Sequence, residues 1–308
     1  MRPDVTLIVR TPNWLGDLVM SLPAISILAR QYPGMSLWSH PRVSGLIPVF
    51  FPSTNVFTAG RLKGSEFSTL LLMTDSFRSA FAGLLSRIPQ RIGYRTDMRG
   101  FLLTNALNPP SDRSHHHSAD YDKLALAAGG SGTPSALKPA VEPEGEPHTA
   151  YFAGARYGSA KMWPHFRELA NRIFKSRGLP SVFYGSPEEK PGLTEISSGV
   201  PLAEVRTDLT LSGLASGLLA AELAVGNDSG GVHLSAVLGI PTVTIFGSTS
   251  PLWTAPTGRF TAAVTTDREC SPCFKRECPE GVPGCLSDIS TDEVLTACMG
   301  LMKMVSDE

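Results

Sequence analysis

Hydrophobic and polar positions along the chain form blocks that predict strands followed by helices. In the first half, apolar runs predict strands near residues 5–10, 35–39, 67–73 and 91–94. Helical periodicity is expected near residues 17–31 and 77–86. The first of these helices has one apolar face, made by Leu18, Leu22, Ile25 and Leu28. Strands that alternate with helices indicate an α/β fold with parallel sheets.

A segment rich in Gly, Pro, Ser and Glu, residues 129–148, interrupts this pattern and is typical of a linker. After it the pattern restarts, with a strand at 149–154, a helix at 163–178, a strand at 181–185 and a strand–loop–helix–strand–loop run at 221–251. We therefore expect two domains, 1–145 and 146–308, with a cleft between them and a C-terminal helix that could pack back on the first. Ligands of open α/β sheets bind at the carboxyl ends of the strands.

Length and composition fit an ordinary globular chain, because 308 residues suit two domains of about 150 residues each. No apolar run reaches the roughly 18 residues of a membrane span, and the opening MRPDVTLIVR does not resemble a signal peptide, so we expect a cytoplasmic protein. The net charge is −1, yet residues 1–145 hold 14 Lys and Arg against 10 Asp and Glu. This basic half favours an acidic partner but lacks the clustered charge that nucleic acid needs.

Three loops of the second half follow predicted strands and suit a nucleoside diphosphate. In VGNDSGGVHLSAV, a helix starts after Asp228 and Ser229, and Gly230 and Gly231 allow close backbone approach to a phosphate attracted by the helix dipole. His233, one turn later, could reach a ligand or only pack. The loop AGARYGSAKMWP offers Lys161, and GSTSPLWTAPTG offers hydroxyl groups. A solvated lysine and a structural turn are the alternatives for these two loops.

Asp17 follows the first predicted strand, in the run NWLGDLV. A carboxylate at that strand end could remove a proton from an acceptor hydroxyl, if a donor diphosphate lies on the second domain. The alternative is that Asp17 only caps its helix.

Four segments together resemble the lipopolysaccharide core heptosyltransferases, glycosyltransferase family 9. They are RTPNWLGDLVMSLPA, LLMTDSFRSAFAGLLSRIPQRIGYRTDMRGFLLT, GARYGSAKMWPHF and GNDSGGVHLSAVLGIPTVTIFGSTSP, and they run in order from residue 10 to beyond residue 250. The run PNWLGD is most similar to the heptosyltransferase II branch. The resemblance implies a GT-B fold, two Rossmann-like domains facing across a central cleft. It also implies transfer of L-glycero-D-manno-heptose from ADP-heptose to a heptose or Kdo residue of the inner core on lipid A, with inversion and without a metal.

The resemblance further implies roles for single residues. Asp17 would be the catalytic base, and Lys161 would act at the donor phosphates. The donor would be held by Gly154, Ser159, Lys161, Glu189, Asp228, Ser229, Gly230 and His233, with Glu188 as the alternative to Glu189 at the adenosine ribose. The acceptor would lie near Asn13, Trp14, Ser76, Arg78 and Arg95, with Arg91 and Arg99 as further candidates. A basic acceptor side suits phosphorylated lipid A, so we expect peripheral contact with the inner face of the inner membrane.

Four cysteines follow the spacing C-x2-C-x4-C-x6-C, namely Cys270, Cys273, Cys278 and Cys285, with Cys298 apart. This spacing is compact enough for a structural zinc or an iron–sulfur cluster, and free thiols or a disulfide are the alternatives. No cofactor is expected for catalysis. Two other functions stay open: a family relative with another acceptor or nucleotide sugar, and a non-catalytic module that binds a nucleotide or a metal.

Overall fold

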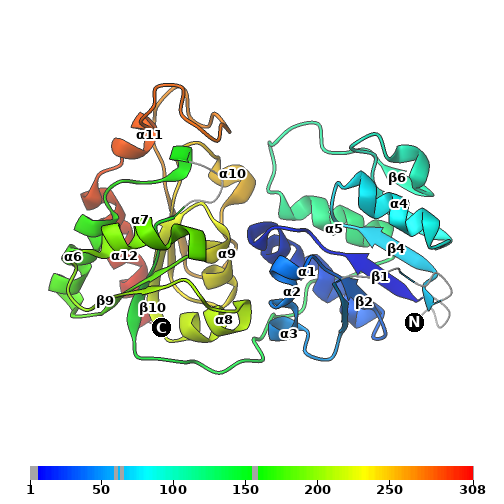
Figure 1. The fold of residues 1–308 in the computed structure, drawn as a ribbon, viewed down its shortest axis with the longest axis horizontal. Coiled ribbons are helices and arrows are strands. Elements are labelled where there is room, and N and C mark those ends of the chain that lie inside the picture. The colour runs from blue at the N-terminus through cyan, green and yellow to red at the C-terminus, as the bar shows by residue number, and fades with distance from the viewer. Residues whose placement is uncertain (1–5, 59–61, 63–65, 155–158, 308) are drawn as a thin grey trace. The chain divides into compact units, whose positions relative to one another are not determined.

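The chain divides into two compact units, residues 1–140 and 141–308, each built on a six-stranded sheet. Figure 1 shows these units in the computed structural model, which describes residues 6–58, 62, 66–154 and 159–307, without the side chain of Ser159. All strand pairs in both sheets are parallel, and helices cover the sheets, so the expected α/β class is confirmed.

The first sheet has the strand order β3-β2-β1-β4-β5-β6. Its strands are β1 (Leu7–Arg10), β2 (Ser36–Trp38), β3 (Asn55–Phe57), β4 (Thr69–Leu72), β5 (Gln90–Tyr94) and β6 (Asn105–Leu107). The four predicted strands are present, and the two that were not predicted, β3 and β6, form the edges of the sheet. Strand order reverses between β1 and β4, so the switch point of this sheet lies there.

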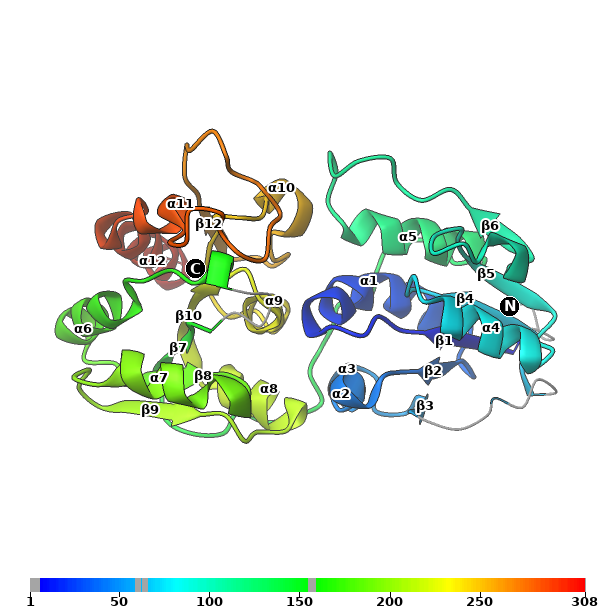
Figure 2. The ribbon, with the colours of Figure 1, turned by 45° about the horizontal axis from the view of Figure 1, so that its top comes forward.

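The helices of the first unit are α1 (Leu15–Gln31), α2 (Pro41–Ser44), α3 (Ile47–Phe50), α4 (Phe77–Leu85) and α5 (Ser118–Ala127), with a 3-10 turn η2 (Gly100–Leu102). The predicted apolar face of α1 is fully buried. Right-handed crossovers that run in opposite directions along the sheet place α1 and α4 on opposite faces. The helix α5, which was not predicted, packs beside α1, and the Tyr32 hydroxyl at the end of α1 donates to Ala128 O at the end of α5 at 2.9 Å. These two helices therefore run in the same direction (Figure 2).

The second sheet has the order β12-β11-β10-β7-β8-β9. Its strands are β7 (His148–Phe152), β8 (Ser181–Tyr184), β9 (Ala203–Arg206), β10 (Ala221–Asn227), β11 (Thr242–Ile245) and β12 (Thr261–Val264). Counted from its own first strand, this is the same order as in the first sheet, with the switch point between β7 and β10. The edge strands β9 and β12 were again the ones that sequence periodicity did not predict.

The helices of the second unit are α6 (Phe166–Arg177), α7 (Lys190–Ser197), α8 (Leu211–Leu219), α9 (Gly230–Val237), α10 (Pro251–Thr254), α11 (Gly284–Ser287) and α12 (Thr291–Ser306), with 3-10 turns η3 (Ser159–Lys161) and η4 (Pro187–Glu189). The helix α6 ends at Gly178, whose φ of 69° is the left-handed conformation that glycine favours. A capping box of Ser290 and Glu293 starts α12, because each side chain bonds the backbone N–H of the other residue.

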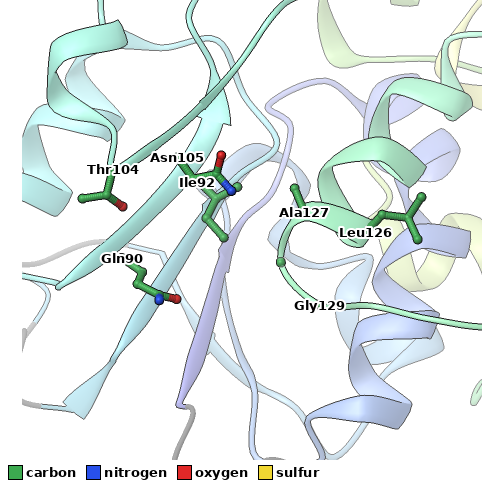
Figure 3. Close-up of a pocket in the computed structure, with 8 residues that line it drawn as sticks. Gln90, Ile92, Thr104, Asn105, Leu126, Ala127 and Gly129 are labelled. Carbon is green, nitrogen blue, oxygen red and sulfur yellow. The ribbon is translucent and has the colours of Figure 1, made fainter.

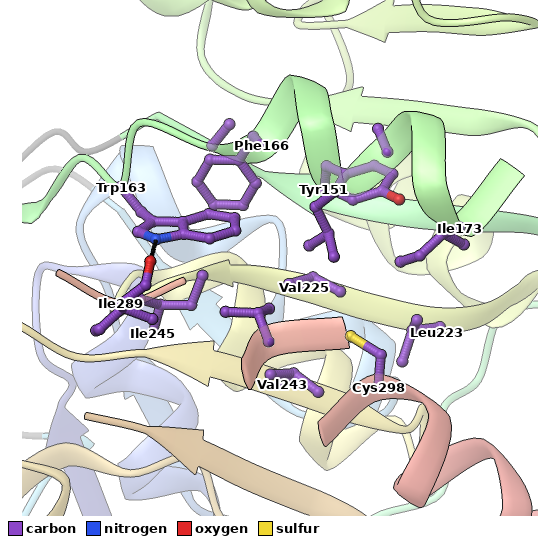
Figure 4. Packing of buried hydrophobic residues seen from close by; sticks show 14 of the residues in the cluster. Tyr151, Trp163, Phe166, Ile173, Leu223, Val225, Val243, Ile245, Ile289 and Cys298 are labelled. Carbon is purple, nitrogen blue, oxygen red and sulfur yellow. Dashed lines mark hydrogen bonds between the residues drawn. The ribbon is translucent and has the colours of Figure 1, made fainter. Parts of the chain in front are cut away.

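One apolar core fixes the loops that follow β7 and β10. Trp163 and Phe166 pack edge to face with ring centroids 5.1 Å apart, and the Trp163 indole N–H donates to Ile289 O at 2.9 Å (Figure 4). The C-terminal helix contributes Cys298 to the same core and packs on α6 and on β10, β11 and β12. These contacts of α12 lie in its own unit, and its packing back on the first domain stays a prediction.

Candidate functional site

Four predicted site residues lie on loops at the switch points of the two sheets. In the first unit, the loop after β1 leads to Asp17, and the loop after β4 contains Ser76. In the second unit, the loop after β7 leads to Lys161, and the loop after β10 contains Asp228. In each sheet the two loops leave the carboxyl ends of adjacent strands, which is where ligands of such folds bind.

Asp17 lies in the first turn of α1, two residues after the helix begins. The N-cap of α1 is Trp14, whose side chain makes no capping hydrogen bond. Asp17 is therefore not the capping residue, although a carboxylate in the first turn still interacts favourably with the helix dipole. Its role as a base stays a prediction.

Asn13 and Trp14, predicted on the acceptor side, are held by cations of the same unit. The buried Arg10 donates from Nη2 to Asn13 Oδ1 at 2.6 Å, and burial lowers the pKa of Arg10 to about 10. The exposed Trp14 ring has the Arg42 guanidinium 5.0 Å from its centroid. The Asn13 amide is thus fixed in orientation, whereas the Trp14 ring lies at the surface.

A polar cluster around Asp120, at the start of α5, was missed by sequence reasoning. The buried Asp120 carboxylate accepts from His115 Nε2 at 2.8 Å and from His117 Nδ1 at 3.0 Å, and the Tyr121 hydroxyl lies 3.1 Å from His117 Nε2. Burial and the charges of nearby carboxylates, Asp17 among them, raise the pKa of Tyr121 well above its usual value. Because α1 and α5 run in the same direction, this cluster lies beside Asp17. The run HHHSADY was the available signal.

The loop after β4 is tied to the loop after β5 by the buried Arg99. Its guanidinium donates to Tyr94 O at 2.8 Å and to Ser76 O at 3.3 Å, also bonds Thr74 O, and lies 3.6 Å from the Asp75 carboxylate. Ser76 itself is the N-cap of α4 and accepts from Ser79 N. Arg99 is therefore a positioning residue in this structure rather than an exposed acceptor contact.

The other arginines of this region do not share one face. Arg91 lies inside β5, and its guanidinium donates to Leu102 O at 2.7 Å and to Ile88 O at 2.5 Å. Arg95 follows the end of β5 and is exposed, as is Arg78 on α4. Arg78 and Arg95 therefore lie at the surface, whereas the Arg91 side chain bonds backbone carbonyls of its own unit.

Lys161 and Asp228, predicted from separate loops, meet in a buried ion pair. Lys161 Nζ lies 2.6 Å from Asp228 Oδ2 and donates to Asp228 O at 3.1 Å. The carboxylate also accepts from Thr249 Oγ1 at 2.7 Å and from Thr254 Oγ1 at 3.3 Å, and His233 Nε2 lies 3.6 Å from Oδ1. The Asp228 carboxylate thus joins the three loops that sequence analysis selected.

Burial alone would raise the pKa of Asp228, but the adjacent His233 imidazole and Lys161 ammonium outweigh it and hold the pKa well below its usual range. Asp228 is therefore ionised. The Asp228 carboxylate, which has several partners, neutralises positive charge within the protein and is not itself a group that attracts a phosphate. The lysine and the hydroxyls that it holds are the groups suited to an anion.

The start of α9 has features of an anion site, and Gly231 there has a role in packing that was not expected. The N-cap Ser229 and the nearby Ser248 have buried hydroxyls without a hydrogen-bond partner among the described residues. Gly231 is required by packing, because a Cβ there would overlap the Phe152 ring. Packing against Phe152 is thus a reason for Gly231 that sequence analysis did not give, and its approach to a phosphate stays a prediction, while Gly230 starts the helix as expected.

Asn227, the last residue of β10, locks the loops of the switch point together. Its buried side chain accepts from Trp163 N at 3.0 Å and donates to Ala153 O at 2.8 Å and Gly154 O at 3.3 Å. The amide therefore fixes the segments before and after residues 155–158 relative to β10. Sequence analysis did not select Asn227, although it directly precedes Asp228.

Replacing Asn227 with Ala is expected to destabilise the second unit by about 1–3 kcal/mol, since it leaves buried backbone groups without partners. Urea denaturation followed by circular dichroism measures the change. Asn171→Ala is the matched control, because the half-buried Asn171 amide makes a solvent-exposed hydrogen bond to Arg167 O of its own helix. Equal midpoints for the two variants would contradict this role of Asn227.

Glu189, the favoured ribose ligand, lies at the carboxyl ends of β7 and β8. Its Oε2 accepts from Ser186 N at 2.7 Å, and Cβ atoms added at Gly154 or Gly185 would contact its carboxylate. Glu188, on the same 3-10 turn, is exposed. Glu189 is thus held at the edge where a ribose is expected, and its contact with ribose stays a prediction. Residues 155–158 and the Ser159 side chain, on which another expected donor contact falls, lie outside the described residues.

The cysteine segment is anchored beside the same loops. Phe274 N donates to Ser248 O at 2.7 Å, and Ala160 N donates to Arg276 O at 3.2 Å. Burial and the neighbouring thiols raise the pKa of Cys285. Among the described residues, no three His, Cys, Asp or Glu side chains are placed to hold a metal ion. A structural zinc on Cys270, Cys273, Cys278 and Cys285 therefore stays a prediction without support from this geometry.

A surface hollow of about 410 Å³ lies away from these residues, at the amino ends of β5 and β6 and the end of α5 (Figure 3). Gln90, Thr104 and Asn105 line one side and Leu126 to Gly129 the other. Because Asp17 and Ser76 follow carboxyl ends of strands, this hollow belongs to the opposite edge of the first sheet.

No helix of the described residues has the length and apolar character that crossing a bilayer requires.

Acid is expected to weaken the contribution of Asp228 to stability. Its pKa is lowered by folding, so its contribution is complete above the unfolded-state pKa of about 3.9 and is lost as pH falls further. The difference in free energy of unfolding between wild type and Asp228→Asn should therefore stay nearly constant from neutral pH to about 5 and shrink as the pH falls below about 4. A difference that stays constant below about pH 4 would contradict the lowered pKa.

Two parallel six-stranded sheets of this topology, each with covering helices, have the architecture of the GT-B fold. The chain has the fold of Escherichia coli ADP-heptose lps heptosyltransferase II, with a TM-score of 0.81 at 22% identity over 98% of this chain and 100% of that one. Residues 58–282 match the sequence model of glycosyltransferase family 9 (heptosyltransferase), and the chain belongs to this family.

Relatives from two bacteria match most of the chain. Lipopolysaccharide heptosyltransferase 2 of Salmonella typhimurium is 26% identical over 96% of this chain and 98% of its own length. Lipopolysaccharide heptosyltransferase 1 of Pseudomonas aeruginosa is also 26% identical, over 88% of this chain and 86% of its own length. The identities are equal, so these two relatives do not distinguish a heptosyltransferase 1 from a heptosyltransferase 2.

Proposed function

We propose that this glycosyltransferase moves L-glycero-D-manno-heptose from ADP-heptose to a heptose or Kdo residue of the lipopolysaccharide inner core on lipid A. The near-full-length similarity to lipopolysaccharide heptosyltransferases supports the substrate class. The observation that carries the mechanism is the buried Lys161–Asp228 pair at the switch point of the second sheet. It holds a cation where a diphosphate would lie at the start of α9.

The donor side stabilises the leaving group. As the bond between the heptose anomeric carbon and the diphosphate oxygen breaks, negative charge grows on ADP. The Lys161 ammonium and the backbone N–H groups at the start of α9 stabilise this charge, and Glu189 holds the ribose. Asp228 acts through Lys161, which it orients, rather than through the phosphate. These residues supply the stabilisation without a metal.

The acceptor side supplies the base. Asp17 removes the proton of the acceptor hydroxyl as its oxygen attacks the anomeric carbon from the face opposite ADP, so a single displacement inverts the configuration. Asn13, Ser76, Arg78 and Arg95 lie on the loops and helix that follow β1, β4 and β5 and contribute contacts to the anionic acceptor. Because this acceptor is a lipid, the enzyme works at the inner face of the inner membrane as a peripheral protein.

Transfer is tested by mixing the purified protein with ADP-heptose and either Kdo-lipid A or heptosyl-Kdo-lipid A. We expect one acceptor to gain the mass of one heptose, with release of ADP, in the presence of EDTA. NMR of the product gives the anomeric configuration, which should be opposite to that of the donor. Absence of transfer to both acceptors, with tight binding of ADP-heptose, would favour a different acceptor. Absence of donor binding would overturn the proposal.

A further inference from the structure

The helix α4 presents its large apolar side chains to solvent and its small ones to the sheet. Its buried residues are Ser79, Ala80 and Gly83, and a Cβ on Gly83 would overlap Leu70 of β4. Its exposed apolar residues are Phe77, Phe81, Leu84 and Leu85, which are 38–54% exposed. A surface helix normally has the opposite arrangement, with its large apolar residues toward the core. Burial within this unit therefore does not explain the apolar residues of α4.

The loop after β5 extends the same surface. The rings of Phe77 and Phe81 stack with centroids 6.2 Å apart, and the Phe101 ring lies 6.2 Å from that of Phe77. Phe101 is 78% exposed and Met98 is 88% exposed. We call Phe77, Phe81, Leu84, Leu85, Met98 and Phe101 the α4 patch. A contiguous apolar surface of this kind marks an interaction site.

The backbone at Met98 supports a function for this exposure. Asp97 and Met98 have φ values of 50° and 54°. Residues other than Gly, Asn and Asp rarely adopt this left-handed conformation. The Asp97 carboxylate accepts from Phe77 N at 3.0 Å and so joins this turn to the start of α4. This turn is strained and places the large apolar Met98 side chain in solvent, so packing in the protein interior does not offset the strain.

Cations surround the α4 patch. Arg78, Arg87 and Arg95 are exposed around it, whereas the acidic groups beside it are Asp97 and Asp75, and Asp75 lies 3.6 Å from the buried Arg99. The whole first unit has 14 Lys and Arg against 8 Asp and Glu. Apolar side chains that enter the acyl boundary, with arginines at the level of the headgroups, are the combination that binds an anionic bilayer.

We propose that the α4 patch docks the protein on an anionic lipid surface. This inference rests on the proposed function, because the acceptor there is a lipid. Ser76 caps α4, and α4 directly follows β4 at the switch point whose other loop leads to Asp17. A bilayer against α4 therefore lies next to the residues assigned to the acceptor, and a lipid-anchored sugar reaches them without leaving its membrane.

The test is co-sedimentation of the full chain with vesicles. We expect wild type to sediment with vesicles of phosphatidylcholine and phosphatidylglycerol, less at high salt, and little with phosphatidylcholine alone. The variant Phe81→Asp/Leu85→Asp/Phe101→Asp should bind at least tenfold more weakly. Leu126→Asp is the matched control, since Leu126 is 64% exposed on α5 at the opposite face of the sheet. It should bind like wild type.

Three results would overturn the proposal. They are wild type that fails to bind the anionic vesicles, a triple variant that binds like wild type, and a wild-type dimer in light scattering that the triple variant converts to a monomer.

Transfer to a deacylated, water-soluble acceptor distinguishes a failure of this docking proposal from a failure of the proposed function. We expect equal kcat/KM there for wild type and the triple variant, with a loss for the variant only on acceptor embedded in vesicles. Wild type that binds vesicles but transfers to neither acceptor overturns the function alone.

Discussion

Asp17→Asn is expected to lower kcat by about 10²- to 10⁴-fold while ADP-heptose binding stays nearly unchanged, because general base catalysis contributes about this much. The amide has the shape of the carboxylate but cannot accept the proton of the acceptor hydroxyl. In the proposed mechanism the donor is bound by the second unit, whose loops do not include residue 17. Single-turnover transfer and calorimetric titration with ADP-heptose measure the two quantities.

Asp292→Asn is the matched control for the position of Asp17 at a helix start. Asp292 also lies in the first turn of its helix, α12, so this variant loses the same kind of interaction with the helix dipole, together with a surface ion pair to Arg172. We expect both variants to lose at most about 1 kcal/mol of stability and only Asp17→Asn to lose transfer. Transfer at the wild-type rate by Asp17→Asn would remove Asp17 as the base and leave it as a helix-stabilising residue.

Lys161→Met is expected to abolish most transfer and to destabilise the second unit. The loss of one donor to a developing oxyanion costs about 10²- to 10³-fold in kcat. The structural cost arises because the buried Asp228 then lacks its cation, and removal of one partner of a buried pair costs about 3–5 kcal/mol. Thr249, Thr254 and His233 remain beside the carboxylate and reduce that cost.

The double variant Lys161→Met/Asp228→Asn separates the two effects. It removes both charges, so most of the lost stability should return, whereas the diphosphate still lacks its cation and transfer should stay low. Thermal unfolding and initial rates give the two results. Recovery of transfer together with stability would mean that Lys161 serves the fold alone, and the assignment of Lys161 to the leaving group would be withdrawn.

The strands that periodicity predicted are the central ones, and the four that it missed are the edges of the two sheets. Central parallel strands are buried on both faces and give continuous apolar runs such as the LLL of β4. The edge strands β3, β6, β9 and β12 are only partly buried, so residues such as Asn55 or Glu204 interrupt any apolar run. The helix α5 was missed because polar residues, HHHSAD, precede its first apolar turn.

The candidate site followed from sequence only where residue chemistry and strand ends coincide. Lys161, Asp228 and His233 were selected one by one, and the structure brings them together. That Asp228 binds Lys161 could not be foreseen, because it depends on which loops meet across β7 and β10. Asn227 and Arg99 were missed or misassigned for the same reason, since their partners are mainly backbone carbonyls from distant loops.

The repeated strand order has a consequence for how such enzymes diversify. Each sheet has its own switch point and its own covering helices, and the chain passes only once from one to the other near residue 140. If the first unit binds the acceptor and the second the donor, as we propose, substitutions that change acceptor choice can accumulate in the first 140 residues without altering recognition of the activated sugar. A chimaera that joins two family members at this crossing should take its acceptor preference from one parent and its nucleotide sugar from the other.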